Sequence, residues 1–257
     1  MRRMMRAATM AALAFTLIAI TFQLGILANH SWGGYHWARS SNPFTVNLGD
    51  NVSSTWDGYL LTASAKWNQS TVLQTAVVAG QSNPRNCRPT SGRVEVCDAA
   101  YGNTGWLGVA QIWITDGVHI TQGTVKLNDT YFNTAKYNTP GWRNLVTCQE
   151  IGHTFGLDHQ DENVNNANLG TCMDYTNNPY GPPDNEYPNQ HDYDELVIIY
   201  SHPDTFATIK SSPGASGANV ELPSEWGKLM KTTHGGRTQV FERDFGGERV
   251  VTFVIWA

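Results

Sequence analysis

Hydrophobic and polar residues change their period several times along the chain, and these changes mark the expected elements. Residues 53–70 place apolar side chains on one helical face, which predicts a helix capped by Ser53 or Ser54. Other short runs are rich in valine, isoleucine and aromatic residues and are separated by glycine, asparagine and proline clusters, a pattern typical of strands. The predicted strands are residues 42–50, 73–80, 92–99, 106–115 and 123–132.

A second helix is predicted before a long polar segment. Thr139 can cap this helix, Pro140 occupies its first position, and Gly156 stands where a helix ends in a left-handed turn. Residues 161–190 are rich in asparagine, proline and glycine, which predicts a loop, and loops this long in compact domains usually have a functional reason. Residues 191–202 then predict a third helix.

The end of the chain has a different character. Residues 211–219 are rich in serine and glycine, and two β-like runs around Gly246 and Gly247 predict a hairpin. The 257 residues are 40% apolar, which is enough for one sizeable core. We therefore expect one main domain over residues 29–202 and a small β-rich extension over residues 203–257.

The first 28 residues predict export. Three arginines precede an apolar run from Ala7 to Leu27, and Ala28 is a small residue suited to signal peptidase cleavage. The alternative is an uncleaved membrane anchor, because the run approaches the ~20 residues that span a bilayer. In both cases the rest of the chain lies outside the cytoplasm. We expect a secreted protein that meets a membrane only through this segment, if the segment is retained.

The charge pattern excludes one class of partner. Only 15% of the residues are charged, the formal net charge is -5, and the chain has no basic run. Phosphate binding needs clustered lysine and arginine. We therefore expect no nucleic-acid partner, and we expect a monomer.

The four cysteines fit an oxidising compartment, and four thiols permit three pairings. Cys87 with Cys97 would close a short loop before a strand. Cys148 with Cys172 would tie the histidine-bearing segment to "TCMDY" and hold two parts of one site together. The alternative is that some of these cysteines are free, buried thiols.

The stretch "QEIGHTFGLDH", residues 149–159, carries the candidate chemistry. Residues four apart in a helix point the same way, so positions 149 and 153 can present two ligands to one metal ion beside Glu150. Gly156 lets the chain reverse, so that a third ligand approaches and a fourth position stays open, as in catalytic zinc sites. Zinc lowers the pKa of bound water to ~7, and a neighbouring carboxylate can take its proton. The pattern predicts a hydrolytic zinc site with Glu150 as the general base and with Gln149, His153 and His159 as the ligands.

This stretch resembles the zinc-binding consensus HExxHxxGxxH of the metzincin metallopeptidases, and the residues that match are Glu150, His153, Gly156 and His159. "CMDY" is similar to the Met-turn of that family, with Met173 as the methionine beneath the metal. Tyr175 stands where astacin-like and serralysin-like members place a tyrosine that ligates zinc or stabilises the tetrahedral intermediate. The order of predicted elements over residues 35–202 also follows the family.

The resemblance implies an α+β fold with a mixed twisted sheet, an active-site helix, the Met-turn and a C-terminal helix. It also implies a zinc-dependent metalloendopeptidase. Residues 105–113 and 126–132 are similar to the matrixin branch, whose edge strand binds an extended peptide or protein substrate by adding it to the sheet.

Gln149 departs from the consensus, which has a histidine there. A glutamine carbonyl oxygen can ligate zinc, but it is neutral and a weaker donor than imidazole. Three hypotheses are open. We favour an active enzyme in which Gln149 is a ligand. The second is a metzincin-shaped protein without turnover that binds a peptide or a cell surface, and the third is a site completed by His191 or His119.

Other candidate ligands carry weaker signals. Asp161 and Glu162 could offer oxygen ligands to calcium, although an asparagine-rich loop that satisfies its own backbone is the favoured interpretation. His119 with Asp116 is similar to part of the structural-zinc loop of matrixins, but the rest of that loop is missing. The remaining histidines lack ligand spacing and are expected to be surface or hydrogen-bonding residues: His30, His36, His202 and His234.

Overall fold

The computed structural model describes residues 30–209, 217–232 and 236–257. The predicted export segment and His234 lie outside the described residues. Within those three ranges, no helix is long and apolar enough to cross a membrane. The elements, in chain order, are β1 (His36–Trp37), β2 (Phe44–Asn51), α1 (Asp57–Trp67), β3 (Leu73–Ala79), β4 (Arg93–Ala99), β5 (Trp106–Thr115), β6 (His119–Asn128), α2 (Asp129–Phe132), α3 (Pro140–His153), α4 (Gln190–Ile199), the 3₁₀ turn η1 (Pro223–Glu225), β7 (Lys228–Thr232), β8 (Thr238–Asp244) and β9 (Arg249–Trp256).

One mixed sheet organises the molecule. Its strand order is β3-β2-β4-β6-β5-β9-β8-β7, and β1 pairs separately with β6. The neighbours β3, β2, β4 and β6 run parallel, whereas β5 is antiparallel to both β6 and β9. The strands predicted for the main domain and those of the C-terminal extension therefore share a single sheet.

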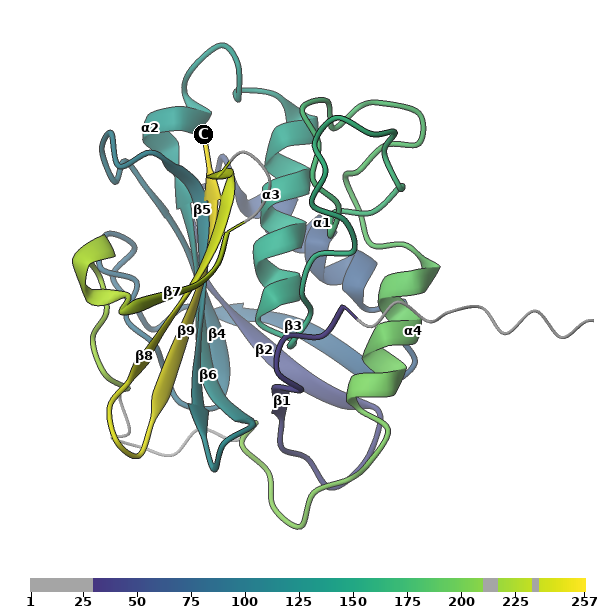
Figure 1. Ribbon diagram of the computed structural model, residues 1–257, viewed down its shortest axis with the longest axis vertical. Coiled ribbons are helices and arrows are strands. Elements are labelled where there is room, and N and C mark those ends of the chain that lie inside the picture. The colour runs from purple at the N-terminus through teal and green to yellow at the C-terminus, as the bar shows by residue number, and fades with distance from the viewer. Residues whose placement is uncertain (1–29, 210–216, 233–235) are drawn as a thin grey trace, which may run out of the picture.

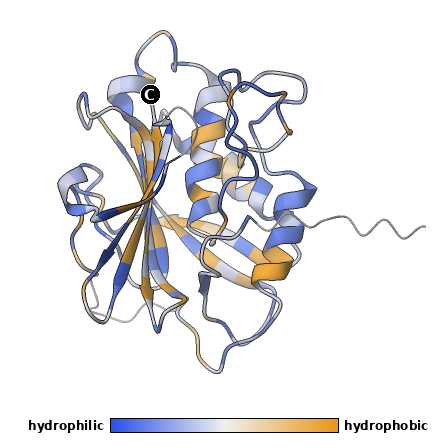
Figure 2. Ribbon diagram, in the orientation of Figure 1, coloured by the Kyte–Doolittle hydropathy of each residue, from blue (hydrophilic) through white to orange (hydrophobic). Residues whose placement is uncertain are grey.

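The two faces of this sheet are covered differently (Figure 1). Helices α1, α3 and α4 lie on one side, where the larger core contains the buried tryptophans Trp37, Trp56 and Trp67. The other side carries a smaller cluster in which Trp113 and Trp226 are buried beside residues of β5 and β9. Hydrophobic residues follow the strands and α3, while the long segment between α3 and α4 is largely hydrophilic (Figure 2).

Helix α3 begins as the sequence predicts, and α1 does not. The side chain of Thr139 accepts a hydrogen bond from the backbone N–H of Trp142, and Pro140 opens α3. By contrast, the N-cap of α1 is Trp56, with no side-chain capping bond. The predicted cap Ser53 donates its hydroxyl to Asp98 instead, because the turn before α1 packs against the end of β4.

The run predicted as a strand over residues 123–132 divides into two elements. Strand β6 ends at Asn128, whose side-chain oxygen accepts from the backbone N–H of Thr130 and caps the short helix α2. Asparagine is a favoured helix cap, so a local hydrogen bond overrides the strand pattern of the aromatic residues that follow. The hairpin predicted around Gly246 is formed by β8 and β9, whereas β7 carries no clear strand pattern and is missed.

Both suggested cysteine pairs form disulfide bonds. Cys87 is bonded to Cys97, and Cys148 is bonded to Cys172. The second bond joins α3 to the segment that carries Met173 and Tyr175. The presence of two disulfide bonds is consistent with an oxidising, extracellular environment.

Candidate metal centre

Three polar residues lie on the last turns of α3 inside the protein. Gln149, Glu150 and His153 are each 1% exposed, although residues of these types usually face solvent unless they are paired. Gln149 and His153 lie four positions apart, so the helix places them on one face. This burial of polar groups needs partners or a ligand, because an unsatisfied polar group away from water costs free energy.

The turn after α3 brings His159 back to this face. Gly156 has a φ of +93°, and a Cβ atom there would collide with the backbone carbonyl of Tyr35. Only glycine fits such a left-handed position at close approach. The carbonyl of Leu157, just after the turn, lies 2.9 Å from Nδ1 of His153, so the reversal also orients the first imidazole.

The two imidazoles face each other through the same ring atom. Nε2 of His153 lies 3.0 Å from Nε2 of His159. Nδ1 of His153 donates to the Leu157 carbonyl, and Nδ1 of His159 faces carboxylate oxygens of Asp158 at 3.4 Å and Glu162 at 3.5 Å. With both Nδ1 atoms protonated, two Nε2 lone pairs meet, and a cation must lie between them, either a proton or a metal ion.

The electrostatic surroundings of the two rings differ. Burial and the neighbouring imidazole of His159 lower the pKa of His153 well below its usual range. Burial alone would also lower the pKa of His159, but hydrogen bonds with Asp158 and Glu162 raise it above its usual value. The carboxylates behind His159 therefore make its Nε2 the more electron-rich donor, as carboxylates do behind many metal-bound histidines.

Gln149 is held through its amide nitrogen. Nε2 donates to the carbonyl of Cys172 at 2.8 Å, and the disulfide between Cys148 and Cys172 fixes that carbonyl next to α3. Oε1 is buried and has no hydrogen-bond partner among the described residues. The amide orientation thus leaves a carbonyl oxygen as the free atom on the helix face of His153.

Glu150 is enclosed between α3 and β5. Burial raises the pKa of its carboxyl well above the usual range, and a backbone hydrogen bond with Ala110 opposes this only in part. A methyl group placed on Gly108 would lie 2.7 Å from Oε1 of Glu150, so the strand backbone passes directly beside the carboxyl. Oε2 has no hydrogen-bond partner within the described ranges.

Met173 lies against α3, and Tyr175 lies against His159. The Sδ atom of Met173 would be 2.7 Å from a methyl group on Gly152, which places the thioether on the inner side of α3. The ring of Tyr175 meets that of His159 edge to face at 4.7 Å. The Tyr175 hydroxyl is buried without a hydrogen-bond partner in the described chain, so it is free to donate to an occupant of the site.

These donors fit a zinc ion. Two imidazole Nε2 atoms 3.0 Å apart and one buried, unpartnered carbonyl oxygen on the same helix face as His153 are the nitrogen and oxygen groups available for an ion. Zinc accepts imidazole nitrogen and oxygen ligands, and catalytic sites use three protein ligands with an open position. The fold brings His153 and His159 together and places Gln149 on the same helix face as His153.

Comparisons with known proteins show distant likeness only. No family model matches the sequence, and no curated protein matches it. High choriolytic enzyme 1, a hatching enzyme zinc-protease from Oryzias latipes (Medaka fish), has 13% identity and a TM-score of 0.35, covering 66% of this chain and 96% of its own. Myroilysin has 12% identity and a TM-score of 0.33, covering 64% and 96%. TM-scores of this size do not establish a shared fold.

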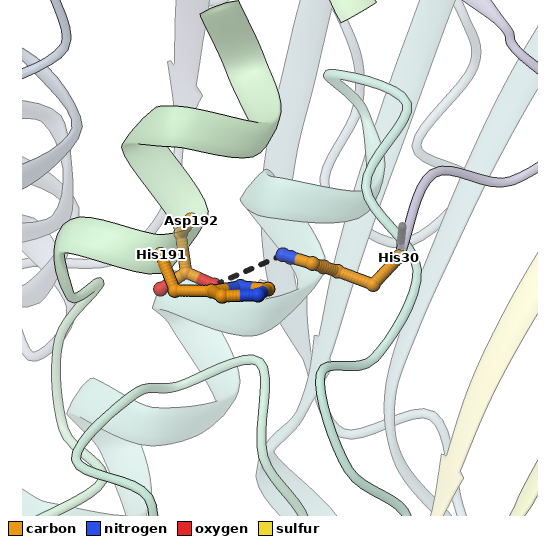
Figure 3. A group of neighbouring side chains, drawn as sticks. All are labelled: His30, His191 and Asp192. Atoms are coloured by element: carbon orange, nitrogen blue, oxygen red, sulfur yellow. Dashed lines mark ion pairs between the residues drawn. The ribbon is translucent and has the colours of Figure 1, made fainter. Parts of the chain in front are cut away.

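The histidines considered as substitutes for Gln149 lie in other clusters. His191 stacks on His30 with ring centroids 4.8 Å apart, and Nε2 of His30 lies 3.7 Å from Oδ1 of Asp192 (Figure 3). His119 lies beside His36 and Asp204. Among the described residues, no group of potential ligands combines His191 or His119 with His153 and His159.

The asparagine-rich loop uses its oxygens internally. Oδ1 of Asp161 accepts from the backbone N–H groups of Glu162 and Asn163. The carboxylate of Glu162 forms an ion pair with Lys231 at 2.7 Å. In these contacts, side-chain oxygens of the loop accept hydrogen bonds from its own backbone, as the asparagine-rich composition favours. The expectation of a calcium site is therefore without support.

Strand β5 is not an edge strand in this structure, contrary to what the matrixin resemblance implies. Strand β9 pairs with it antiparallel from Trp106↔Trp256 to Ile114↔Arg249. The ring of Phe253 on β9 stacks on the imidazole of His153, with centroids 4.4 Å apart and an interplanar angle of 6°. The C-terminal strands therefore occupy the edge where a substrate was expected and cover a predicted ligand.

A second contact of the C-terminal strands lies on the other side of the centre. Nζ of Lys231 on β7 is 2.7 Å from Oδ2 of Asp158 and 2.7 Å from Oε1 of Glu162, the two carboxylates that face His159. The sequence gives no sign of Phe253 or Lys231 as site residues, since each has an ordinary place in a strand pattern. Only the pairing of β9 with β5 brings them to the metal centre.

Proposed function

We propose that this chain is a secreted zinc-dependent metalloendopeptidase. The observation that carries the proposal is the approach of His153 and His159 through Nε2 atoms 3.0 Å apart, with an unpartnered buried amide oxygen and a buried carboxyl on the same helix as His153. Such a group of unsatisfied donors and acids in a protein interior marks a functional site. Its order along the chain is that of the metzincin consensus.

Each residue has a defined role in this proposal. Gln149 Oε1 and the two imidazoles hold the ion, and Glu162 and Asp158 orient the ring of His159 from behind. When bound, zinc supplies a Lewis acid that polarises a carbonyl and acidifies water. Glu150 takes a proton from the attacking water and returns it to the leaving amine. The Tyr175 hydroxyl donates to the oxygen that becomes negative.

The proposed substrate is a peptide or protein segment in extended conformation. It would pair with β5, whose backbone beside Glu150 would become an edge once β9 leaves, and strand addition of this kind draws affinity from main-chain hydrogen bonds. Strand β9 holds that edge in the present structure. We therefore propose that the enzyme is latent as long as β9 is paired, and that substrate enters when β7–β9 separate from β5.

Zinc stoichiometry tests this function. The wild-type chain should retain one zinc ion more than a His153→Ala/His159→Ala variant after dialysis without added metal, as counted by mass spectrometry of the element. Gln149→His should hold the same number of ions with higher affinity, because imidazole is a stronger donor than an amide. Asn144→His, on the same helix but two turns away from His153, is the matched control.

Two results would overturn the proposal. The first is equal zinc content in the wild type and the double variant. The second is an ion that Gln149→His gains and the wild type lacks, which would favour the alternative function, a metzincin-shaped module that binds a peptide or a cell surface without hydrolysing it.

A further inference from the structure

A second group of imidazoles, which contains no residue of α3, gathers around one carboxylate. Oδ1 of Asp204 lies 3.4 Å from Nε2 of His119, 3.6 Å from Nε2 of His36 and 3.8 Å from Nε2 of His202. All three rings use the same nitrogen, and all three approach the same oxygen. The residues come from three parts of the fold: β1, the start of β6, and the segment after α4.

The backbone brings these residues together without strain. Strand β1 pairs parallel with β6, and His36 is the direct partner of His119 in that register. The segment that follows α4 passes the same end of the sheet (Figure 1), and the N–H of Asp204 donates to the carbonyl of Arg39 at 2.8 Å. The four side chains are therefore positioned by regular pairing and by a backbone hydrogen bond.

The surroundings leave Oδ1 and the Nε2 atom of His36 available for a ligand. Arg39 takes the other oxygen, Oδ2, through its backbone N–H at 3.2 Å and its guanidinium at 2.9 Å. Nδ1 of His36 lies 2.8 Å from the carbonyl of Gly34 and donates to it. Nε2 of His36, a residue 4% exposed, is buried without a hydrogen-bond partner in the described ranges.

An ordinary ion pair does not account for this arrangement. Arg39 already pairs with Asp204 through Oδ2 at 2.9 Å, and the 3.6 Å between Nε2 of His36 and Oδ1 of Asp204 is too long for a hydrogen bond. Nδ1 of His36 donates to the carbonyl of Gly34, so Nε2, 3.6 Å from the carboxylate oxygen of Asp204, is the ring atom left to hold a ligand. Two electron-rich atoms at that separation call for a cation between them.

The distances and ring orientations suit a zinc site built on His36, His119 and Asp204, whose ligand atoms all lie within 4.8 Å of one another. His202 lies outside that group and approaches Asp204 only. Zinc–nitrogen bonds of about 2.0–2.1 Å in a tetrahedron put neighbouring ligand atoms about 3.4 Å apart, close to the 3.4, 3.6 and 3.8 Å observed. The rings of His119 and His202 meet that of His36 edge to face at 82° and 84°, so their edges can converge on one point. In the cluster of Figure 3 the rings of His30 and His191 are stacked at 21°, and their lone pairs run side by side.

We propose that His36, His119 and Asp204 form a second, structural metal site that binds zinc, and that the exposed ring of His202, 3.8 Å from Oδ1 of Asp204, turns in as the fourth ligand when the ion binds. With His202 turned in, three imidazoles and one carboxylate would fill a tetrahedral set with no open position, which is the arrangement of structural rather than catalytic zinc. The hydrogen bonds from His36 to Gly34 and from Arg39 to Asp204 supply the outer support that fixed metal ligands have. His202 has a side chain 55% exposed, so the ion can enter from solvent.

The test counts this ion apart from the proposed catalytic one. In the His153→Ala/His159→Ala background, the full chain should still bind one zinc ion, and zinc should raise its melting temperature because it binds the folded state. Adding His202→Ala should weaken that binding at least about tenfold and remove the thermal shift. Because His202 is exposed, its loss leaves the apo fold intact, and a circular dichroism spectrum unchanged from the parent checks this.

A matched control changes an exposed residue near the cluster. Thr205→Ala, one position after Asp204, should leave zinc affinity and the thermal shift unchanged. The proposal is wrong if the background variant binds no zinc, or if His202→Ala binds zinc as tightly as its parent. A chain that lacks the catalytic ion but keeps this one would contradict the proposed function alone.

Discussion

Glu150→Gln is expected to abolish peptide hydrolysis while the zinc ion stays bound. The amide has nearly the shape of the carboxyl group but cannot accept a proton from water, and general acid–base catalysis contributes about 10²- to 10⁴-fold to rate. Glu150 is not among the three proposed ligands, so the metal content should not change. The measurement is cleavage of fluorescently labelled casein by chains that also carry Phe253→Ala/Lys231→Ala, the change expected to relieve latency, paired with the zinc count of the same sample.

The control for this variant is another buried glutamate. Glu195 on α4 is 2% exposed and accepts backbone hydrogen bonds from His30 and Ser31. Glu195→Gln removes the same charge from a similarly buried position outside the metal centre and should keep hydrolysis within about threefold of its parent. If Glu150→Gln cleaves casein as fast as Glu195→Gln, then Glu150 is not the base.

Loosening the C-terminal strands is expected to activate the enzyme. The double variant Phe253→Ala/Lys231→Ala removes the ring stacked on His153 and the cation paired with Asp158 and Glu162. Truncating a buried phenylalanine costs about 3–5 kcal/mol of stability. Phe253 is buried only while β9 is paired with β5, so the substitution destabilises the closed form more than the open form. Each 1.4 kcal/mol shifts a population about tenfold, so casein cleavage should rise at least about tenfold.

The matched control removes a phenylalanine and a lysine of the C-terminal strands, neither of which forms a hydrogen bond, ion pair or ring contact with the candidate metal centre within the described residues. Phe241 on β8 packs on Trp226 in the smaller cluster, and Lys228 is an exposed residue at the start of β7. Phe241→Ala/Lys228→Ala should weaken the strands without uncovering the metal centre, so its activity should rise less. Equal rates for the wild type and Phe253→Ala/Lys231→Ala, at equal zinc content, would show that β9 does not block the site.

Local patterns predicted the elements that depend on local interactions. Thr139 and Pro140 mark the start of α3 because capping is settled within one turn. The strand over residues 106–115 follows from its β-branched and aromatic residues. The i, i+4 spacing of Gln149 and His153, followed by a glycine that permits reversal, predicted which residues share one side of the metal centre.

The rest depended on contacts between distant segments. Strand β9 could have formed an independent hairpin with β8, and nothing near it in sequence specifies β5 as its other neighbour. The cluster around Asp204 joins residues as far apart as His36 and His202, so ligand spacing along the chain cannot reveal it. His36 and His202 were expected to be surface or hydrogen-bonding residues. The pairing of β1 with β6 places His36 directly beside His119, which makes a ligand role the better interpretation.

The most direct test is a crystal structure of the full chain with zinc, with diffraction measured on both sides of the zinc absorption edge. The account predicts an anomalous peak within bonding distance of Nε2 of His153, Nε2 of His159 and Oε1 of Gln149. A peak beside Asp204 would bear only on the second site. A zinc-soaked crystal with no peak between His153 and His159, or with the Gln149 oxygen directed away from it, would contradict the central claim.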